Sequence, residues 1–307
     1  MAKKQYFCSI VRRTKQHNLT KIHTMKKPFP LLLLAAAMTF CSCEKFAMES
    51  AENTAATTTS EDDPSEPDGN TTIRINTDGL GSYSRITCSL FLAGSKVKNI
   101  NQTSGRTDFG TIRTTLEQGT YTLVAIAHNG AGNATVSSPE KVTFYNNKCT
   151  DTACQYTTLE VDADGAEKTV TPQRAVAMVR LHVNDEIPDT AKTVKFYYTG
   201  GSSTLDATTG YGCVNSRQTE ERTMSTTLKD YDIYTFPHSD GKKLHITVTV
   251  YDSDSKTIAT KELTDIEVKQ GYKTTCSVNL FSNNGDDETQ STFTFDPAWD
   301  GETNIDF

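Results

Sequence analysis

Cysteine is the residue type with the broadest capacity for chemistry in this sequence, because thiols form disulfides, bind metals and accept modifying groups. Eight cysteines occur, and Cys149 and Cys154 share the short loop CTDTAC. This spacing predicts a local disulfide between them. Structural zinc sites need paired ligand doublets, and this C-x4-C pair has no second doublet nearby, so no metal site is expected. Cys88 and Cys276 fall in alternating apolar runs and are interpreted as buried small hydrophobic residues.

Recognisable catalytic motifs do not occur in the sequence, which has no GxSxG, no HExxH and no P-loop. The segment DADG at 162–165 copies part of a calcium loop. Its twelfth position would be Thr171, where an acidic ligand is required, so we interpret the segment as a turn. Four histidines follow residue 43 and none has a partner at metal-ligand spacing: His128, His182, His238 and His245. We therefore expect neither enzyme activity nor a cofactor.

A further cysteine, Cys43, ends a largely apolar run. Residues 28–40 are too few to span a bilayer, which takes ~20 residues, but they match the apolar core of a secretory signal, ~7–15 residues long. Met25-Lys26-Lys27 supplies the positive segment before the run. The pattern resembles a bacterial lipoprotein signal, in which the cysteine after the cleavage site receives acyl chains such as palmitate. We prefer Cys43 over Cys41, which follows a bulky residue. An ordinary secretory signal cut nearby is the alternative.

The segments on either side of Cys43 are not expected to contribute to a folded core. Residues 1–42 form the signal region, with Met1 and Met25 as alternative starts of translation. Residues 44–70 are rich in Ser, Thr, Glu, Asp and Pro and contain no Val, Ile or Leu. Such a segment cannot bury enough apolar surface to fold, so we predict a lipidated flexible tether over 43–70.

The net charge of the chain limits its classes of partner. The eight basic residues before Cys43 leave with the signal, so 23 basic residues remain against 38 acidic ones, a net charge of −15. An acidic surface repels phosphate backbones, which argues against nucleic-acid binding. The expected contact with the membrane is therefore made by the N-terminal acyl chains.

From residue 71 onward the sequence consists of short runs that alternate polar and apolar residues, separated by turn residues. The first set comprises 71–77, 85–94, 120–130 and 141–145. In 120–130 both faces carry apolar side chains, which predicts a central strand that is buried on both sides. Short strands at regular intervals with turns between them predict a β-sandwich.

A second set of runs begins at residue 174, and it comprises 174–183, 192–200, 231–237, 243–252, 256–263 and 272–281. In 243–252 the apolar residues alternate strictly, which predicts a half-buried antiparallel strand. The segment 161–173 lies between the two sets and marks a domain boundary. We therefore predict an all-β chain with two tandem antiparallel sandwiches, divided as signal region 1–42, tether 43–70, N-terminal sandwich 71–171, C-terminal sandwich 172–283 and tail 284–307.

The C-terminal tail contains one more short strand pattern. Phe293 and Phe295 alternate with threonines, and Pro297 ends the pattern. One interpretation is an edge strand of the chain's own sheet. The other is an interaction strand that adds to a neighbour's sheet, with Phe293 and Phe295 as anchors and Trp299 as a third.

The stretch RAVAMVRLHVNDEIP…KTVKFYYTGGSSTLDATTGYG, residues 174–212, resembles the FimB-type fimbrial subunit family of Bacteroidales, the lipoprotein subunits of type V fimbriae. The similar elements are Arg174 opening an Ala/Val strand, Ile187-Pro188 in the next turn, Tyr198-Thr199-Gly200, and the Leu205 to Gly210 segment. The resemblance implies two transthyretin-like β-sandwiches and no enzyme activity. It also implies that the chain anchors or caps a fimbrium (pilus) at the outer membrane, exposed on the cell surface, through contacts with other fimbrial subunits.

Two alternatives remain open at this point. Stalk or tip subunits have a similar architecture; they lose a first strand to an Arg-directed protease, and the groove accepts a strand from the next subunit. Arg74 and Arg85 are candidate cleavage positions, or ordinary strand residues. The second alternative is a glycan-binding surface lipoprotein, which usually presents exposed aromatic side chains. The single tryptophan, Trp299, weakens that interpretation.

Overall fold

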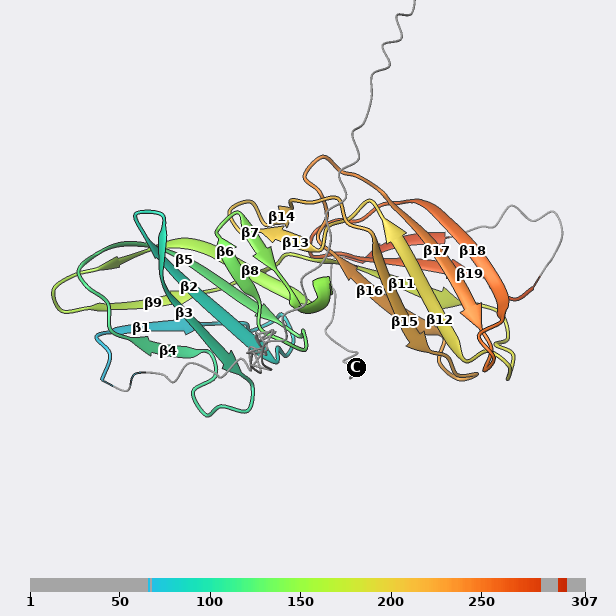
Figure 1. Cartoon of the computed structure of the whole chain (residues 1–307), viewed down its shortest axis with the longest axis horizontal. Coiled ribbons are helices and arrows are strands. Elements are labelled where there is room, and N and C mark those ends of the chain that lie inside the picture. The colour runs from blue at the N-terminus through green and yellow to red at the C-terminus, as the bar shows by residue number, and fades with distance from the viewer. Residues whose placement is uncertain (1–65, 67, 283–291, 297–307) are drawn as a thin grey trace, which may run out of the picture. The chain divides into compact units, whose positions relative to one another are not determined.

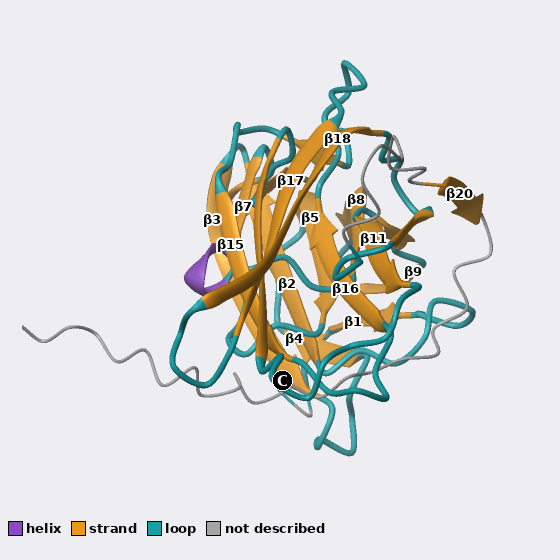
Figure 2. Cartoon of the chain, turned by 90° about the vertical axis from the view of Figure 1, so that its right-hand side faces the viewer, coloured by secondary structure: helices purple, strands orange, loops and turns teal. Residues whose placement is uncertain are grey.

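The structure is a computed structural model and describes residues 66, 68–282 and 292–296 (Figure 1). These residues form strands and one short 3-10 helix, η1 (Tyr145–Asn147), as Figure 2 shows. The predicted all-β class is therefore confirmed. Within the described residues, no helix has the length and apolar character needed to cross a bilayer.

Two sheets draw their strands from residues 71–174. The three-stranded sheet has the order β4 (Thr111–Thr114), β1 (Thr71–Ile75), β9 (Ala166–Val170). The five-stranded sheet has the order β10 (Gln173–Arg174), β8 (Thr152–Val161), β5 (Gly119–His128), β2 (Arg85–Leu92), β3 (Ser95–Thr103). Their apolar faces share one hydrophobic cluster, which includes Ile73, Leu90 and Leu123.

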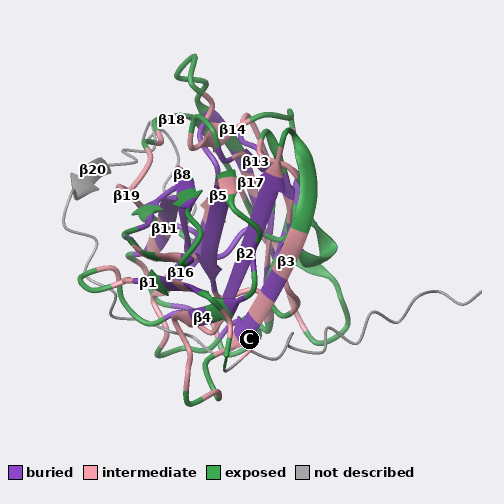
Figure 3. Ribbon diagram, turned by 90° about the vertical axis from the view of Figure 1, so that its left-hand side faces the viewer, coloured by how far each residue is buried: buried purple, intermediate pink, exposed green. Residues whose placement is uncertain are grey.

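β5 confirms the expectation of a strand buried on both faces (Figure 3). It pairs with β2 on one side and β8 on the other. Leu123 and Ala125 belong to the cluster just described, whereas Val124 and Ile126 belong to a separate cluster on the opposite face. An apolar residue at nearly every position is what a strand between two packed layers requires.

Two further sheets draw their strands from residues 177–296. One has the order β16 (Asp230–Thr235), β11 (Ala177–Val183), β19 (Lys273–Val278), β20 (Thr292–Asp296). The other has the order β15 (Gln218–Thr223), β12 (Thr193–Thr199), β17 (Leu244–Tyr251), β18 (Thr257–Ile266). β17 confirms the predicted alternation, because Leu244, Ile246, Val248 and Val250 are all 0–1% exposed within the core cluster of these sheets.

A fifth sheet takes strands from both sets, in the order β14 (Tyr211–Gly212), β13 (Thr204–Asp206), β7 (Lys141–Thr143), β6 (Thr135–Ser138). β13 pairs with β7 through Leu205 and Val142. Beside it lies the cluster that receives Val124 and Ile126, in which the rings of Phe144 and Phe236 stack with centroids 5.3 Å apart. The proposed division at 171–172 thus separates two strand sets that also share a sheet and a core cluster.

Two strand pairs are parallel, which the sequence did not predict: β1 with β9 and β11 with β19. Parallel neighbours need a long crossover connection. For β1 and β9 the strands of the facing five-stranded sheet form this connection, because most of them lie between β1 and β9 in the chain. Residue periodicity reports which face of a strand is buried and carries no information about its partner.

The segment predicted as a tether ends earlier than expected, because its last residues bond to the folded body. The carboxylate of Glu66 accepts hydrogen bonds from Lys98 Nζ at 2.8 Å and from the Thr115 N–H at 2.7 Å. These bonds, the one from Lys98 above all, lower the pKa of Glu66 to about 2. The Asn70 side chain donates to the Leu116 carbonyl oxygen and accepts from the Leu116 N–H. Glu66 and Asn70 therefore bond to the folded body, and the tether stays a prediction for the residues before them.

Candidate functional site

The predicted tail strand, β20, lies at one end of its own sheet. It pairs antiparallel with β19, with Phe293 opposite Cys276 and Phe295 opposite Thr274. Both β19 residues are fully buried. This backbone arrangement corresponds to the home edge strand, the simpler of the two interpretations, and strand addition to a neighbour stays a prediction. Trp299 and the predicted lipidation site Cys43 lie outside the described residues.

A carboxylate fixes the chain where it leaves β19 on the way to β20. Asp185 Oδ1 accepts from the Leu280 N–H at 3.0 Å, and Oδ2 accepts from the N–H groups of Phe281 and Ser282 at 2.6 and 2.8 Å. Partial burial disfavours the charge of Asp185, but these donors outweigh burial and hold the pKa of the carboxyl below its usual value. We call Asp185 with residues 280–282 the exit clamp.

The predicted Cys149–Cys154 disulfide is not formed in the structure, where both cysteines are free and buried. Their thiols have separate acceptors: Cys149 Sγ lies 3.4 Å from the Ser202 carbonyl oxygen and Cys154 Sγ lies 4.0 Å from that of Ala207. Both side chains belong to the third hydrophobic cluster. Burial raises the pKa of both thiols to about 12, so they pack as small hydrophobic groups. Cys88 and Cys276 are also buried, as expected.

Arg174, which opens the stretch that resembles fimbrial subunits, forms a buried ion pair. Its guanidinium donates to both oxygens of Asp151 at 2.8 and 2.9 Å, and the two side chains are 7% and 14% exposed. It also donates to the Leu80 carbonyl oxygen at 2.5 Å, and Tyr83 Oη lies 3.4 Å from Asp151. Burial disfavours the Arg174 charge, but Asp151 outweighs burial and raises the pKa of Arg174. We call this group the β10 clasp, because it holds β10 to the loop between β1 and β2.

The candidate cleavage positions are both inside strands. Arg74 is in β1, the middle strand of its sheet, and pairs with Glu167 at 2.5 Å. Arg85 begins β2 and donates to Asn133 Oδ1 at 2.8 Å and to two carbonyl oxygens of the loop before β6. The ordinary interpretation, that both are strand residues, describes where the structure places them.

The histidines and the aspartate-rich turn do not come together into a site. His182 lies 2.6 Å from Asp230 and His245 lies 2.8 Å from Glu262, each as a separate surface pair. His128 is buried, and burial lowers its pKa to about 3. In residues 66, 68–282 and 292–296, no three His, Cys, Asp or Glu side chains are placed to hold a metal ion. The segment 162–165 forms the expected turn between β8 and β9.

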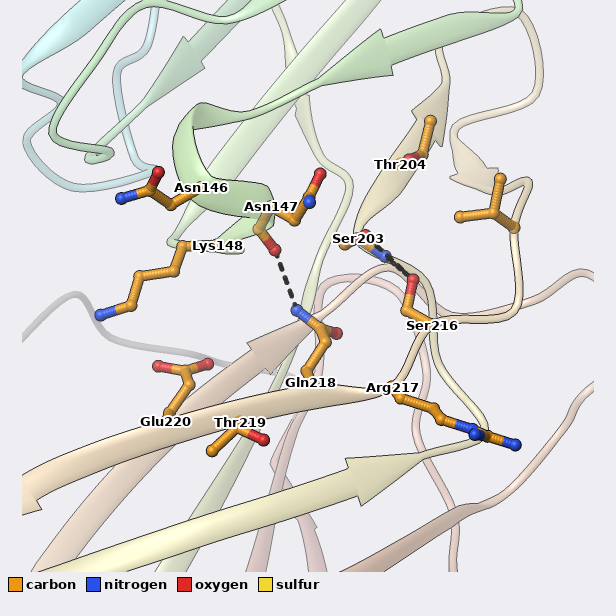
Figure 4. Close-up of a pocket in the computed structure, with 11 residues that line it drawn as sticks. Asn146, Asn147, Lys148, Ser203, Thr204, Ser216, Arg217, Gln218, Thr219 and Glu220 are labelled. Carbon is orange, nitrogen blue, oxygen red and sulfur yellow. Dashed lines mark hydrogen bonds between the residues drawn. The ribbon is translucent and has the colours of Figure 1, made fainter. Parts of the chain in front are cut away.

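A polar pocket with a volume of about 440 Å³ lies where three distant segments meet (Figure 4). The segments are 146–148 at η1, 203–204 at the start of β13, and 214–220 leading into β15. Ser203 and Ser216 join two of these segments, because Ser216 Oγ accepts from the Ser203 N–H at 2.8 Å. Gln218 joins the third, donating from Nε2 to the Asn147 carbonyl oxygen at 3.3 Å.

The pocket lining carries one carboxylate and two cationic side chains. Glu220, 4% exposed, accepts from Tyr198 Oη at 2.6 Å and from Arg222 Nη2 at 2.6 Å. Burial, and then the Glu220 charge, raise the pKa of Tyr198 well above its usual value, so it remains a donor. Lys148 and Arg217 add two positive charges to the lining. The pocket therefore combines amides, hydroxyls and cationic groups, with its one carboxylate already hydrogen-bonded.

Comparison with known proteins gives a family match. The profile of a family of unknown function, DUF6562, matches residues 96–307, more than half of the chain. The chain belongs to this family. The match includes residues 174–212, on which the FimB-type resemblance rests, but it shows DUF6562 and not the FimB-type family. No curated protein matches the chain.

Among solved structures, the chain is similar to a candidate adhesin from Bacteroides thetaiotaomicron, with 12% identity and a TM-score of 0.47 over 74% of this chain and 95% of that one. A fimbrial assembly protein from Parabacteroides distasonis has 14% identity and a TM-score of 0.37 over 74% and 98%. A candidate polysaccharide-binding protein from Bacteroides thetaiotaomicron has 10% identity and a TM-score of 0.45 over 68% and 91%. Similarities this distant carry no argument about function.

Sequence reasoning missed the pocket, because its segments lie far apart in the chain. The doublet Asn146-Asn147 was recognisable as a turn, and both residues have a φ of 54°, in the left-handed region that Asn tolerates. Nothing in the sequence indicated that this turn would lie against β15.

Proposed function

We propose that the chain is an outer-membrane lipoprotein subunit of a fimbrium, which anchors or caps the fibre at the cell surface through protein–protein contacts. Its acyl chains, attached at Cys43, hold it in the membrane, and the segment after Cys43 links the lipid to the folded body. The proposal assigns no catalytic step to the protein.

The observation that carries the proposal is the order of segments along the chain. An apolar run of signal length ends at Cys43, a polar acidic segment follows, and an all-β body begins where Glu66 bonds to Lys98. Lipid anchoring followed by a spacer suits a protein that works outside the membrane surface. The resemblance of residues 174–212 to fimbrial subunits gives this arrangement its specific role.

The structure offers sheet edges for contacts with other subunits. In its four-stranded sheet, β20 has β19 on one side and no further strand on the other among the described residues. Main-chain groups on such an edge can pair with an added strand. This edge is the first surface that we assign to a fimbrial partner.

A cross-linking experiment in the producing cells tests the proposal. The full chain, with an affinity tag at an exposed turn such as 252–256, is cross-linked at the cell surface and isolated from outer membranes. Fimbrial subunits are expected among the specifically captured proteins, and fimbriae should detach from cells that lack the chain. Normal attachment in those cells, with no fimbrial protein captured, contradicts the proposal.

The stalk or tip alternative predicts cleavage at Arg74 or Arg85 in the assembled fibre. Cleavage at either position requires opening a paired strand, because both residues lie within β1 or β2. An intact N-terminal sequence on chains recovered from fimbriae therefore distinguishes the anchor from a processed stalk subunit.

A further inference from the structure

The polar pocket contains a buried hydrogen-bond acceptor with no donor. Gln218 is 7% exposed, and its Oε1 has no hydrogen-bond partner. Its Nε2 makes only long contacts, at 3.3 Å to the Asn147 carbonyl oxygen and 3.8 Å to Cys149 Sγ. A buried acceptor left unpaired is costly. A ligand hydroxyl that reaches Oε1 would supply the missing donor, while Nε2 keeps its contact with Asn147.

Next to Gln218, Arg217 lines the same pocket and is exposed to solvent. No hydrogen bond or ion pair of its guanidinium occurs within the part of the chain that the structure describes. In Figure 4 its side chain lies on one side of Gln218, with Lys148 and Glu220 on the other. A guanidinium without a carboxylate is suited to a planar anion, which it binds through two parallel hydrogen bonds.

The remaining lining favours a ligand rich in hydroxyl groups. The side chains of Asn146 and Thr219 are exposed at the pocket. Amides and hydroxyls both donate and accept, as sugar hydroxyls do. The pocket volume of about 440 Å³ lies within the range of small-ligand sites, about 300–1,000 Å³.

We propose that this pocket binds an acidic saccharide, with a uronic acid carboxylate on Arg217 and a ring hydroxyl donating to Gln218 Oε1. Lys148 adds positive potential, and Glu220 does not repel the ligand strongly because Tyr198 and Arg222 already bond to it. The site is separate from the fimbrial role, and it would give a surface subunit affinity for anionic polysaccharide. Neither the sheet edge at β20 nor the lipid takes part in it.

Calorimetric titration of the full chain in detergent with digalacturonic acid tests the proposal, and the methyl ester of the same disaccharide serves as the uncharged ligand. Saturable binding of the acid is expected, with the ester at least about tenfold weaker, since a hydrogen bond to a charged group is worth about 1.5–3 kcal/mol. Arg217→Gln should weaken binding of the acid by a similar factor. Gln218→Leu should weaken binding of the acid and the ester alike.

Arg113→Gln is the matched control, because Arg113 is exposed on β4 and does not line the pocket. It should leave the affinity unchanged, and thermal unfolding of each variant confirms that it is folded. The proposal is overturned by an absence of saturable binding, by equal affinity for acid and ester, or by unchanged affinity in folded Arg217→Gln. It is also overturned if a hexa-aspartate peptide binds more tightly than the saccharide, which would make the pocket a peptide site.

Discussion

At the scale of single residues, the β10 clasp shows how burial changes the contribution of an ion pair to stability. The side chains of Arg174 and Asp151 are 7% and 14% exposed, whereas those of Arg74 and Glu167 are 46% and 66% exposed. Removing one partner of a buried pair leaves an uncompensated charge. An exposed pair is screened by water and contributes little.

We therefore expect Arg174→Gln to lower the free energy of unfolding by about 3 kcal/mol, and the matched Arg74→Gln to lower it by less than about 1 kcal/mol. Urea denaturation measures both. Adding Asp151→Asn to Arg174→Gln should restore part of the loss, because no unpaired buried carboxylate then remains. Equal losses for Arg174→Gln and Arg74→Gln would show that the clasp is no stronger than a surface pair.

The exit clamp gives a pH dependence whose sign follows from the lowered pKa of Asp185. A carboxyl whose pKa is lower in the folded state stabilises the fold fully above its unfolded pKa, near 3.8. That contribution is lost as the pH falls through the lower folded value. Asp185→Asn should cost about 1 kcal/mol at pH 7, and the difference from the unmodified chain should shrink toward pH 3. Asp164→Asn, in the exposed turn 162–165, should change neither the free energy of unfolding at pH 7 nor its dependence on pH. If the difference in free energy of unfolding between Asp185→Asn and the unmodified chain does not change with pH, the Asp185 charge does not stabilise the exit clamp.

At the scale of elements, the sequence predicts strands well where a strand has an apolar face. All of β5 except Gly119 lies within the predicted run 120–130, and β17 lies within 243–252, with the expected faces buried. β15, by contrast, has the sequence QTEERT and no apolar residue. Its buried positions, Gln218 and Glu220, form hydrogen bonds, so hydrophobic periodicity could not detect the strand or the pocket that it lines.

β20 provides the second test at this scale. Deleting 289–307 removes the strand that pairs with β19, and should lower the thermal midpoint, since β19 then loses its antiparallel neighbour. Deleting 297–307 removes Trp299 but keeps β20, and should leave the midpoint nearly unchanged. If the longer deletion keeps its midpoint but fails to join fimbriae, β20 acts on a neighbour's sheet and is not a home strand.

At the scale of the whole molecule, we propose a folded β body that a lipidated segment holds off a membrane. With the body beginning at Glu66, about 22 residues follow Cys43, and a flexible chain of that length has a mean reach of roughly 25 Å. The net charge of −15 expected after cleavage at Cys43 opposes direct contact with anionic lipid. In the proposed function the acyl chains at Cys43 supply the attachment, because several chains together give stable anchoring.

Cell fractionation of Cys43→Ala tests this central claim most directly, with Cys41→Ala as the matched control two residues away. We expect Cys41→Ala to stay in the outer membrane with fimbriae attached. We expect Cys43→Ala to be either released to the soluble fraction or retained as an uncleaved precursor, with fimbriae shed into the medium. A Cys43→Ala chain that is cleaved normally, stays in the outer membrane and keeps its fimbriae would contradict anchoring through Cys43.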